Sequence, residues 1–255
     1  TAEKKSTVWG KISFSAAEKN TLMTVKPQIA GRDPMKKIAC ILLALAACIL
    51  PAGCAATPDL TEYVSEYRSS IYEGTEGGYT VFASFTRREY PYRADGNVGE
   101  MQELFEIALT APDNTRVYHI EYTVAGETHS ADLAFDSVRL AHTASLSMPE
   151  PTEESITFTV RDAEDTDVQP LAIEAACLRP QGALNLPDLL DRVRTAEEER
   201  FSALSSGHSF AGELYVRLLC ENGASYYYIG LTDRSGHTYS MLADAGTGEI
   251  VATRE

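Results

Sequence analysis

Apolar and polar residues alternate with a period of two through most of residues 75–180, which is the pattern of half-buried β-strands. About seven short runs of this kind follow one another. The clearest run places four apolar side chains on one face, namely Tyr118, Ile120, Tyr122 and Val124. Turn-forming residues separate the runs, and Ala125-Gly126 is a candidate two-residue hairpin turn. We therefore predict an antiparallel β-sandwich-like domain over residues 75–180.

The pattern changes after a linker-like stretch at residues 179–187. Apolar residues then recur at helical spacing up to Gly207, a typical helix end, and they are Leu190, Val193, Phe201 and Leu204. Strand-like runs follow, with Asn222-Gly223 as the strongest hairpin signal. Residues 184–255 are thus expected to form a small α+β domain in which a helix packs on an antiparallel sheet.

Helical spacing also occurs within residues 54–74, ahead of the predicted sandwich. Thr57-Pro58 is typical of a helix start, because threonine caps helices and proline suits their first turn. The apolar positions that follow are Leu60, Tyr63, Val64, Tyr67 and Ile71. They predict a tether followed by a short amphipathic helix.

Residues 35–53 have the pattern of an export signal. Met35-Lys36-Lys37 is a short cationic start, and the thirteen residues that follow carry no charge. Such a run fits a signal-peptide core and is shorter than the ~20 residues that span a bilayer. A buried apolar helix and a single membrane anchor are the alternatives. Residues 1–34 are interpreted as a non-native upstream extension, with a genuine N-terminal segment as the alternative.

The signal ends in Pro51-Ala52-Gly53-Cys54, which resembles the lipobox of bacterial lipoproteins. The resemblance implies that the thiol of Cys54 receives a diacylglyceryl group and that cleavage leaves Cys54 as the first residue of the mature chain. It also implies a location at the cell membrane, lipid-anchored and facing outside the cytoplasm.

The charge of the chain changes at the same place. All seven lysines lie at or before Lys37, whereas residues 54–255 hold 14 arginines and 34 acidic residues, a net charge of −20. An acidic chain of this kind repels the phosphates of nucleic acid. We therefore expect no nucleic-acid partner.

The turns near the C-terminus resemble those of PepSY-like domains. The resemblance rests on Gly230-Leu231-Thr232-Asp233-Arg234-Ser235-Gly236 and on Asp244-Ala245-Gly246-Thr247-Gly248-Glu249. It implies an extracytoplasmic accessory domain that modulates a peptidase, and it supplies no catalytic residue.

Candidate catalytic chemistry lies on the predicted hairpin. A two-residue turn places His119 opposite Asp132, and Glu121 opposite Ser130, on one face of the sheet. A histidine, a carboxylate and a hydroxyl can support nucleophilic chemistry, which makes His119, Ser130 and Asp132 the candidates. The alternative is the polar outer face of a sheet.

An acidic loop offers candidate metal ligands. Asp162, Asp165 and Asp167 are candidates for calcium, because loop carboxylates build calcium sites. A solvated acidic loop is the alternative.

Two further groups of residues have both a structural and a functional interpretation. Cys177 and Cys220 form a disulfide in an oxidising compartment or remain two buried thiols. Tyr226, Tyr227 and Tyr228 place two rings on one strand face and one on the other, either for core packing or for stacking on a ligand.

Together these features predict an extracytoplasmic, membrane-anchored, non-catalytic binding protein. Its expected partners are the membrane, through Cys54, and an envelope protein or peptidase. No cofactor is expected. The alternative is an envelope hydrolase that uses the face formed by His119, Ser130 and Asp132.

Overall fold

The computed structural model describes residues 57–93, 97–165 and 167–255. The predicted upstream extension, the signal peptide and Cys54 lie outside the described residues. Those that are described all belong to one compact unit. Within them, no helix is long and apolar enough to cross a bilayer.

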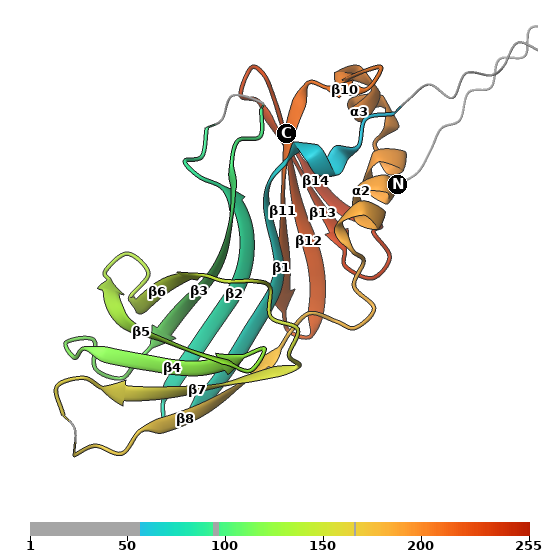
Figure 1. Cartoon of the computed structure of the whole chain (residues 1–255). Coiled ribbons are helices and arrows are strands. Elements are labelled where there is room, and N and C mark those ends of the chain that lie inside the picture. Colours follow the sequence, from blue (N-terminus) through green and yellow to red (C-terminus); the bar gives the residue numbers. More distant parts are fainter. Residues whose placement is uncertain (1–56, 94–96, 166) are drawn as a thin grey trace, which may run out of the picture. The chain divides into compact units, whose positions relative to one another are not determined.

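Eight strands of the described chain close into an antiparallel barrel, in the order β1-β2-β3-β6-β5-β4-β7-β8 (Figure 1). The last strand returns to the first, where Tyr72 pairs with Cys177 and Glu73 pairs with Ala176. The barrel strands are β1 (Val64–Glu76), β2 (Tyr79–Glu89), β3 (Met101–Thr110), β4 (Tyr118–Val124), β5 (Glu127–Asp136), β6 (Ala141–Ser147), β7 (Ser155–Asp162) and β8 (Leu171–Cys177).

The prediction of a mainly β fold is confirmed, but the sandwich is wrong, because the sheet closes on itself. The alternation of apolar and polar residues shows which face of each strand is buried. A barrel and a sandwich have the same alternation, so the pattern could not distinguish them. Inward-facing side chains from all eight strands fill one interior, with Phe105, Tyr122 and Phe158 at its centre. Closure depends on the pairing of β1 with β8, which are about a hundred residues apart in the sequence. Pairing between such distant strands produces no pattern in the residues of either strand.

The predicted helix near residue 60 is also wrong. A single 3-10 turn, η1 (Leu60–Tyr63), leads directly into β1. The strand carries a bulge between Arg68 and Ser70 and is buried on both faces, since Ile71 and Tyr72 belong to two different cores. Its apolar positions therefore fail to alternate and imitate helical spacing.

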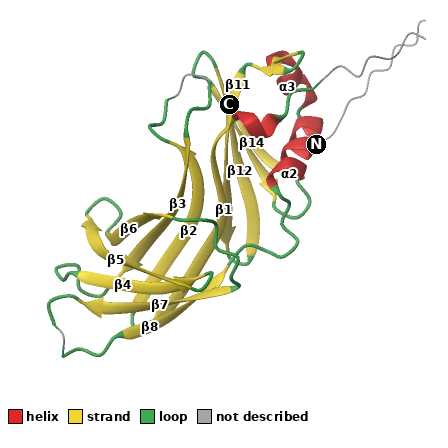
Figure 2. Cartoon of the chain, viewed as in Figure 1, coloured by secondary structure: helices red, strands yellow, loops and turns green. Residues whose placement is uncertain are grey.

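The C-terminal part places helices on one face of an antiparallel sheet, as expected from the sequence (Figure 2). Asn222 and Gly223 both have positive φ and form the predicted hairpin turn. The predicted helix is split in two, and Gly207 lies in a small hairpin after it. The elements are α2 (Leu186–Ala196), α3 (Glu198–Leu204), β9 (Ser205–Ser206), β10 (Ser209–Phe210), β11 (Gly212–Glu221), β12 (Ala224–Asp233), β13 (Thr238–Asp244) and β14 (Ile250–Arg254).

The barrel and the helix-covered sheet share β1. The first half of β1 pairs in parallel with β11, from Val64 opposite Leu214 to Arg68 opposite Arg217. The hydrogen-bonded sheet of the described chain therefore continues across the boundary expected between residues 180 and 184. That boundary marks a change of architecture within one continuous sheet.

A histidine, His142, is buried between the barrel strands. His142 on β6 packs edge-on against Tyr118, with ring centroids 4.8 Å apart, and lies 5.1 Å from Phe135. Neither of its ring nitrogens has a hydrogen-bond partner among the described residues. Burial lowers the pKa of His142 below its ordinary value of 6.5, and the charge of Asp113 opposes this only in part.

We expect this histidine to make the fold sensitive to acid. Unfolded chains bind a proton at His142 below about pH 6.5, whereas the folded protein resists it, so stability falls as pH is lowered through that value. Urea unfolding at pH 7.5 and 5.5 should show a smaller loss of stability in His142→Phe than in the wild type. The exposed His208 provides the control, His208→Phe, which should retain the wild-type loss. An unchanged pH dependence in His142→Phe would contradict the assignment.

Candidate functional site

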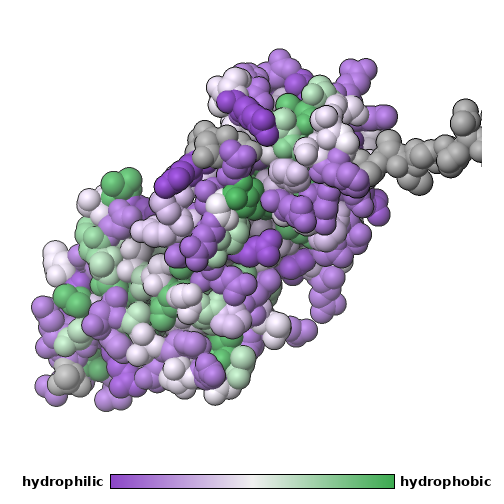
Figure 3. All heavy atoms as spheres, turned by 45° about the horizontal axis from the view of Figure 1, so that its top comes forward, coloured by the Kyte–Doolittle hydropathy of each residue, from purple (hydrophilic) through white to green (hydrophobic). Residues whose placement is uncertain are grey.

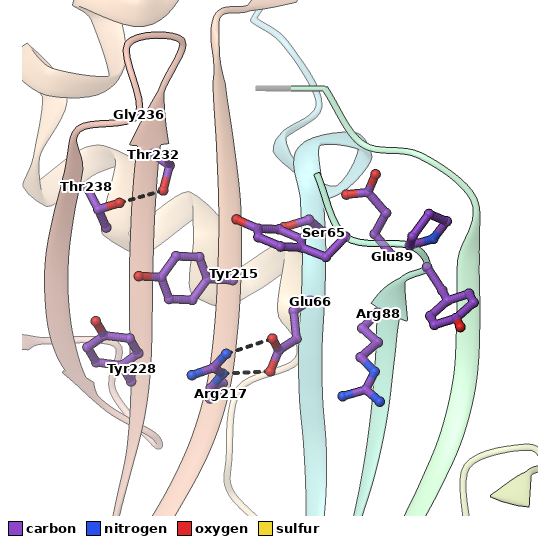
Figure 4. A pocket seen from close by; sticks show the side chains of 13 residues that line it. Ser65, Glu66, Arg88, Glu89, Tyr215, Arg217, Tyr228, Thr232, Gly236 and Thr238 are labelled. Atoms are coloured by element: carbon purple, nitrogen blue, oxygen red, sulfur yellow. Dashed lines mark hydrogen bonds and ion pairs between the residues drawn. The ribbon is translucent and has the colours of Figure 1, made fainter. Parts of the chain in front are cut away.

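A cavity of about 620 Å³ lies where β1 and β2 leave the barrel and meet β11–β13 (Figure 4). Its volume is in the range that accommodates small ligands. We call it the tyrosine pocket, and it is lined by Ser65, Glu66, Arg88, Glu89, Tyr90, Pro91, Tyr92, Tyr215, Arg217, Tyr228, Thr232, Gly236 and Thr238.

The alternation of β11 determines which side chains reach the pocket. Leu214, Val216 and Leu218 belong to the core beneath the helices. The residues between them, Tyr215 and Arg217, therefore point to the opposite face of the sheet, which carries the pocket.

A glycine allows the floor of the pocket to form. Gly230 on β12 stands directly opposite Tyr215, and a Cβ atom on it would lie 1.9 Å from the ring carbon Cζ of Tyr215. The bare backbone thus lets the Tyr215 ring lie against β12. There it meets the ring of Tyr228 at 5.8 Å, and the Tyr228 hydroxyl is 3.0 Å from Oγ of Ser240.

Ion pairs occupy one side of the pocket. The guanidinium of Arg217 donates two hydrogen bonds to the carboxylate of Glu66, at 2.6 and 2.8 Å, and Figure 4 shows this pair bridging β11 and β1. These bonds raise the pKa of Arg217. Arg88 lies 3.4 Å from Glu106. Both arginines that line the pocket are therefore already paired with carboxylates.

Two buried carboxylates without an ion pair in the described chain lie at or next to the other side of the pocket: Glu89 lines it, whereas Glu213 does not line it but interacts with Tyr92, which does. The Oε2 atom of Glu89 is buried with no hydrogen-bond partner among the described residues. Glu213 has an exposed fraction of 0%, and the group that interacts with its carboxylate is the phenol of Tyr92, through charge and a side-chain hydrogen bond. It stands opposite Thr232, a lining residue.

Tyr92 connects these carboxylates to the rim of the pocket. Burial raises the pKa of the Tyr92 phenol, and so do the charge of Glu213, a side-chain hydrogen bond to Glu213 and the charge of Glu89. The residues Tyr90 and Tyr92 are nevertheless 61% and 57% exposed. Two exposed aromatic residues thus stand beside the buried Glu89, which has one oxygen without a partner among the described residues, an arrangement suited to contact with a ligand.

The candidate catalytic hairpin has the predicted register. His119 pairs with Asp132, and Glu121 pairs with Ser130. The Nδ1 atom of His119 lies 2.8 Å from a carboxylate oxygen of Asp132. This face is the outside of the barrel, where the Asp132 side chain is 82% exposed. Figure 3 shows one side of the molecule, on which hydrophobic residues are interspersed among hydrophilic ones.

The acidic loop uses its carboxylates for local structure. One oxygen of Asp162 accepts backbone N–H bonds from Glu164 and Asp165, and the other pairs with Arg116. Asp165 accepts the backbone N–H of Asp167. Across the part of the chain that the structure describes, no group of three or more histidine, cysteine or acidic side chains is placed to hold a metal ion.

The two cysteines of the described chain are free thiols in this structure. The Sγ atom of Cys220 lies 3.4 Å from the carbonyl oxygen of Leu178, the residue after Cys177. Burial raises the pKa of the Cys220 thiol.

Sequence reasoning singled out one residue of the pocket for ligand contact, Tyr228, and named Thr232 and Gly236 only as parts of the PepSY-like turn. The tyrosine run divides as predicted, with Tyr227 in the core beneath the helices and Tyr228 on the pocket face. A usable signal was the alternation of Leu214, Val216 and Leu218 with Tyr215 and Arg217, because it places the tyrosine and the arginine together on one face of a strand. No protein-family model and no curated protein matches this chain. The candidate site therefore rests on the geometry of the chain itself.

Proposed function

We propose that this chain is a lipid-anchored, extracytoplasmic protein that binds a ligand in the tyrosine pocket without transforming it. The anchor follows from the lipobox resemblance at Cys54, and loss of fatty-acid labelling in Cys54→Ala would test it. The PepSY-like turns support an accessory role beside an envelope protein or peptidase.

The observation that carries the proposal is the pairing of exposed aromatic residues with a buried carboxylate around one cavity. The rings of Tyr90 and Tyr92 offer apolar area at the rim, and Glu89 offers a polar contact inside it. Much of the wall comes from hydrogen-bonded strands, so much of the site is formed before a ligand arrives.

A hydrolase remains the second candidate, because His119 and Asp132 are in hydrogen-bond contact. Their position on an exposed barrel face favours the binding protein. General acid–base and nucleophilic chemistry gain most from a site that excludes water, and Asp132 is open to solvent.

The binding proposal predicts that ligands stabilise the protein through the pocket. In a thermal-unfolding screen of the full chain against amines, peptides, sugars and lipids, a binding compound at 100 times its Kd should add about 2.7 kcal/mol of stability. Tyr92→Ala should remove most of this gain, because it deletes a rim ring.

Val138→Ala is the matched control, since Val138 is an exposed apolar residue on the turn between β5 and β6. It should keep the full gain. A screen without binding compounds, or one whose compounds stabilise Tyr92→Ala as strongly as wild type, would show that the tyrosine pocket is not the ligand site.

A further inference from the structure

We propose that the tyrosine pocket selects a cationic group, an ammonium or a guanidinium, carried by a basic peptide side chain or by a free amine. This inference rests on the proposed binding function and specifies the chemistry of its ligand. The juxtaposition that carries it is the position of Glu89 and Glu213 beside the tyrosine rings.

The buried carboxylates lack a cation within the described chain. Glu89 lines the pocket, is almost fully buried and has one oxygen without a partner, while Glu213 is fully buried next to the lining residue Tyr92, whose phenol hydrogen-bonds to it. Arg217 and Arg88, the arginines that line the pocket, are engaged with Glu66 and Glu106. Burying a charge without a partner is unfavourable, and a cationic ligand would supply the missing partner.

The rings around the carboxylates suit the same ligand. Aromatic faces attract cations, and tyrosine side chains contribute four rings to the pocket wall. The guanidinium carbon of Arg217 already lies 5.4 Å from the centroid of the Tyr215 ring. A ligand ammonium between the rings and Glu89 would combine this attraction with charge-assisted hydrogen bonds.

The charge of residues 54–255 acts in the same direction. Residues 54–255 carry a net charge of −20, which draws cations toward the surface and repels anions. Within the pocket an anionic ligand would face Glu66 and Glu89, and the two lining arginines are already paired with carboxylates. The geometry therefore disfavours a phosphate or a carboxylate as the group that is recognised.

The test is calorimetric titration of the full chain with three probes. They are a lysine tripeptide with both ends blocked, the same peptide with its lysine Nε-acetylated, and cadaverine as a free amine. The lysine peptide or cadaverine should bind at least about tenfold more tightly than the acetylated peptide, because charge-assisted hydrogen bonds are lost on acetylation. Binding by the peptide alone assigns the cation to a basic side chain, and binding by cadaverine alone assigns it to a free amine.

Variants then locate the selectivity. Glu89→Gln and Glu213→Gln should each weaken binding of the preferred probe by about tenfold. Glu221→Gln, on an exposed residue at the end of β11, should leave binding unchanged. Thermal unfolding of each variant shows whether it is folded. If Glu213→Gln does not fold, the binding affinity of Glu89→Gln alone tests whether the pocket selects a cation, since Glu89 lines the pocket.

Three outcomes would overturn the inference. Equal binding of the lysine and acetylated peptides would exclude selection of a cation, and so would cation binding that survives Glu89→Gln and Glu213→Gln undiminished. Failure of both cationic probes, while neutral or anionic compounds stabilise the chain in a manner that depends on Tyr92, would reject the cation and leave the pocket as a binding site. Failure of every ligand class would reject the proposed function as well.

Discussion

Replacing Gly74 with alanine is expected to lower the free energy of unfolding by roughly 3 kcal/mol, the largest stability loss that we predict for a single methyl group in this chain. Gly74 lies on β1 where β8 closes the barrel. A Cβ atom there would lie 2.3 Å from the carbonyl oxygen of Glu174 and 2.8 Å from Cα of Ala175. Both atoms belong to the backbone of β8, so no side-chain rotation can relieve the clash and the two strands must separate.

Equilibrium urea unfolding of the full chain measures this effect. Gly182→Ala is the matched control, because a Cβ atom on Gly182 meets nothing within 4 Å, and its effect should stay within about 0.5 kcal/mol. If Gly74→Ala were as stable as Gly182→Ala, the tight contact between β1 and β8, and with it the closure of the barrel, would be incorrect.

Replacing Glu213 with methionine is expected to stabilise the protein by about 2 kcal/mol, although it removes a charged group from the candidate site. The side chain is fully buried on β11, its carboxylate has no ion pair within the described residues, and its hydrogen bond to Tyr92 leaves most of its burial cost uncompensated. Methionine has a similar length, adapts its shape and carries no charge. The gain in stability should be accompanied by weaker binding of the ligand.

Glu221→Met provides the comparison on the same strand, because Glu221 is exposed, and its effect on stability should be small. Urea unfolding and ligand titration of both variants give the two quantities. A loss of stability in Glu213→Met would mean that Glu213 supports the fold, and the unpaired carboxylate would lose its significance for binding.

Local features of the fold could be predicted from the sequence because neighbouring residues determine them. The turn at Ala125-Gly126 gives the register that pairs Tyr122 with His129. The turn at Asn222-Gly223 likewise joins β11 to β12. Both rest on a two-residue turn between strands of matching alternation. The helix-plus-sheet order of the C-terminal part followed from the change of period.

Features that depend on distant pairing could not be predicted. Barrel closure joins β1 to β8, and the tyrosine pocket joins the end of β2 to β11–β13. The strand β1 belongs to both cores, which removes its alternation and led to the incorrect helix. The significance of Glu213 likewise depends on its burial beside Glu89 and Tyr92, and a carboxylate in a strand-like run gives no sign of burial.

A crystal structure of the full chain with the tightest ligand from the thermal screen would show whether the tyrosine pocket is the ligand site. We expect density for the ligand between the rings of Tyr92 and Tyr228, with its polar group within hydrogen-bond distance of Glu89. A ligand bound instead on the outer barrel face at His119 and Asp132, with the tyrosine pocket empty, would contradict this expectation and would favour the hydrolase.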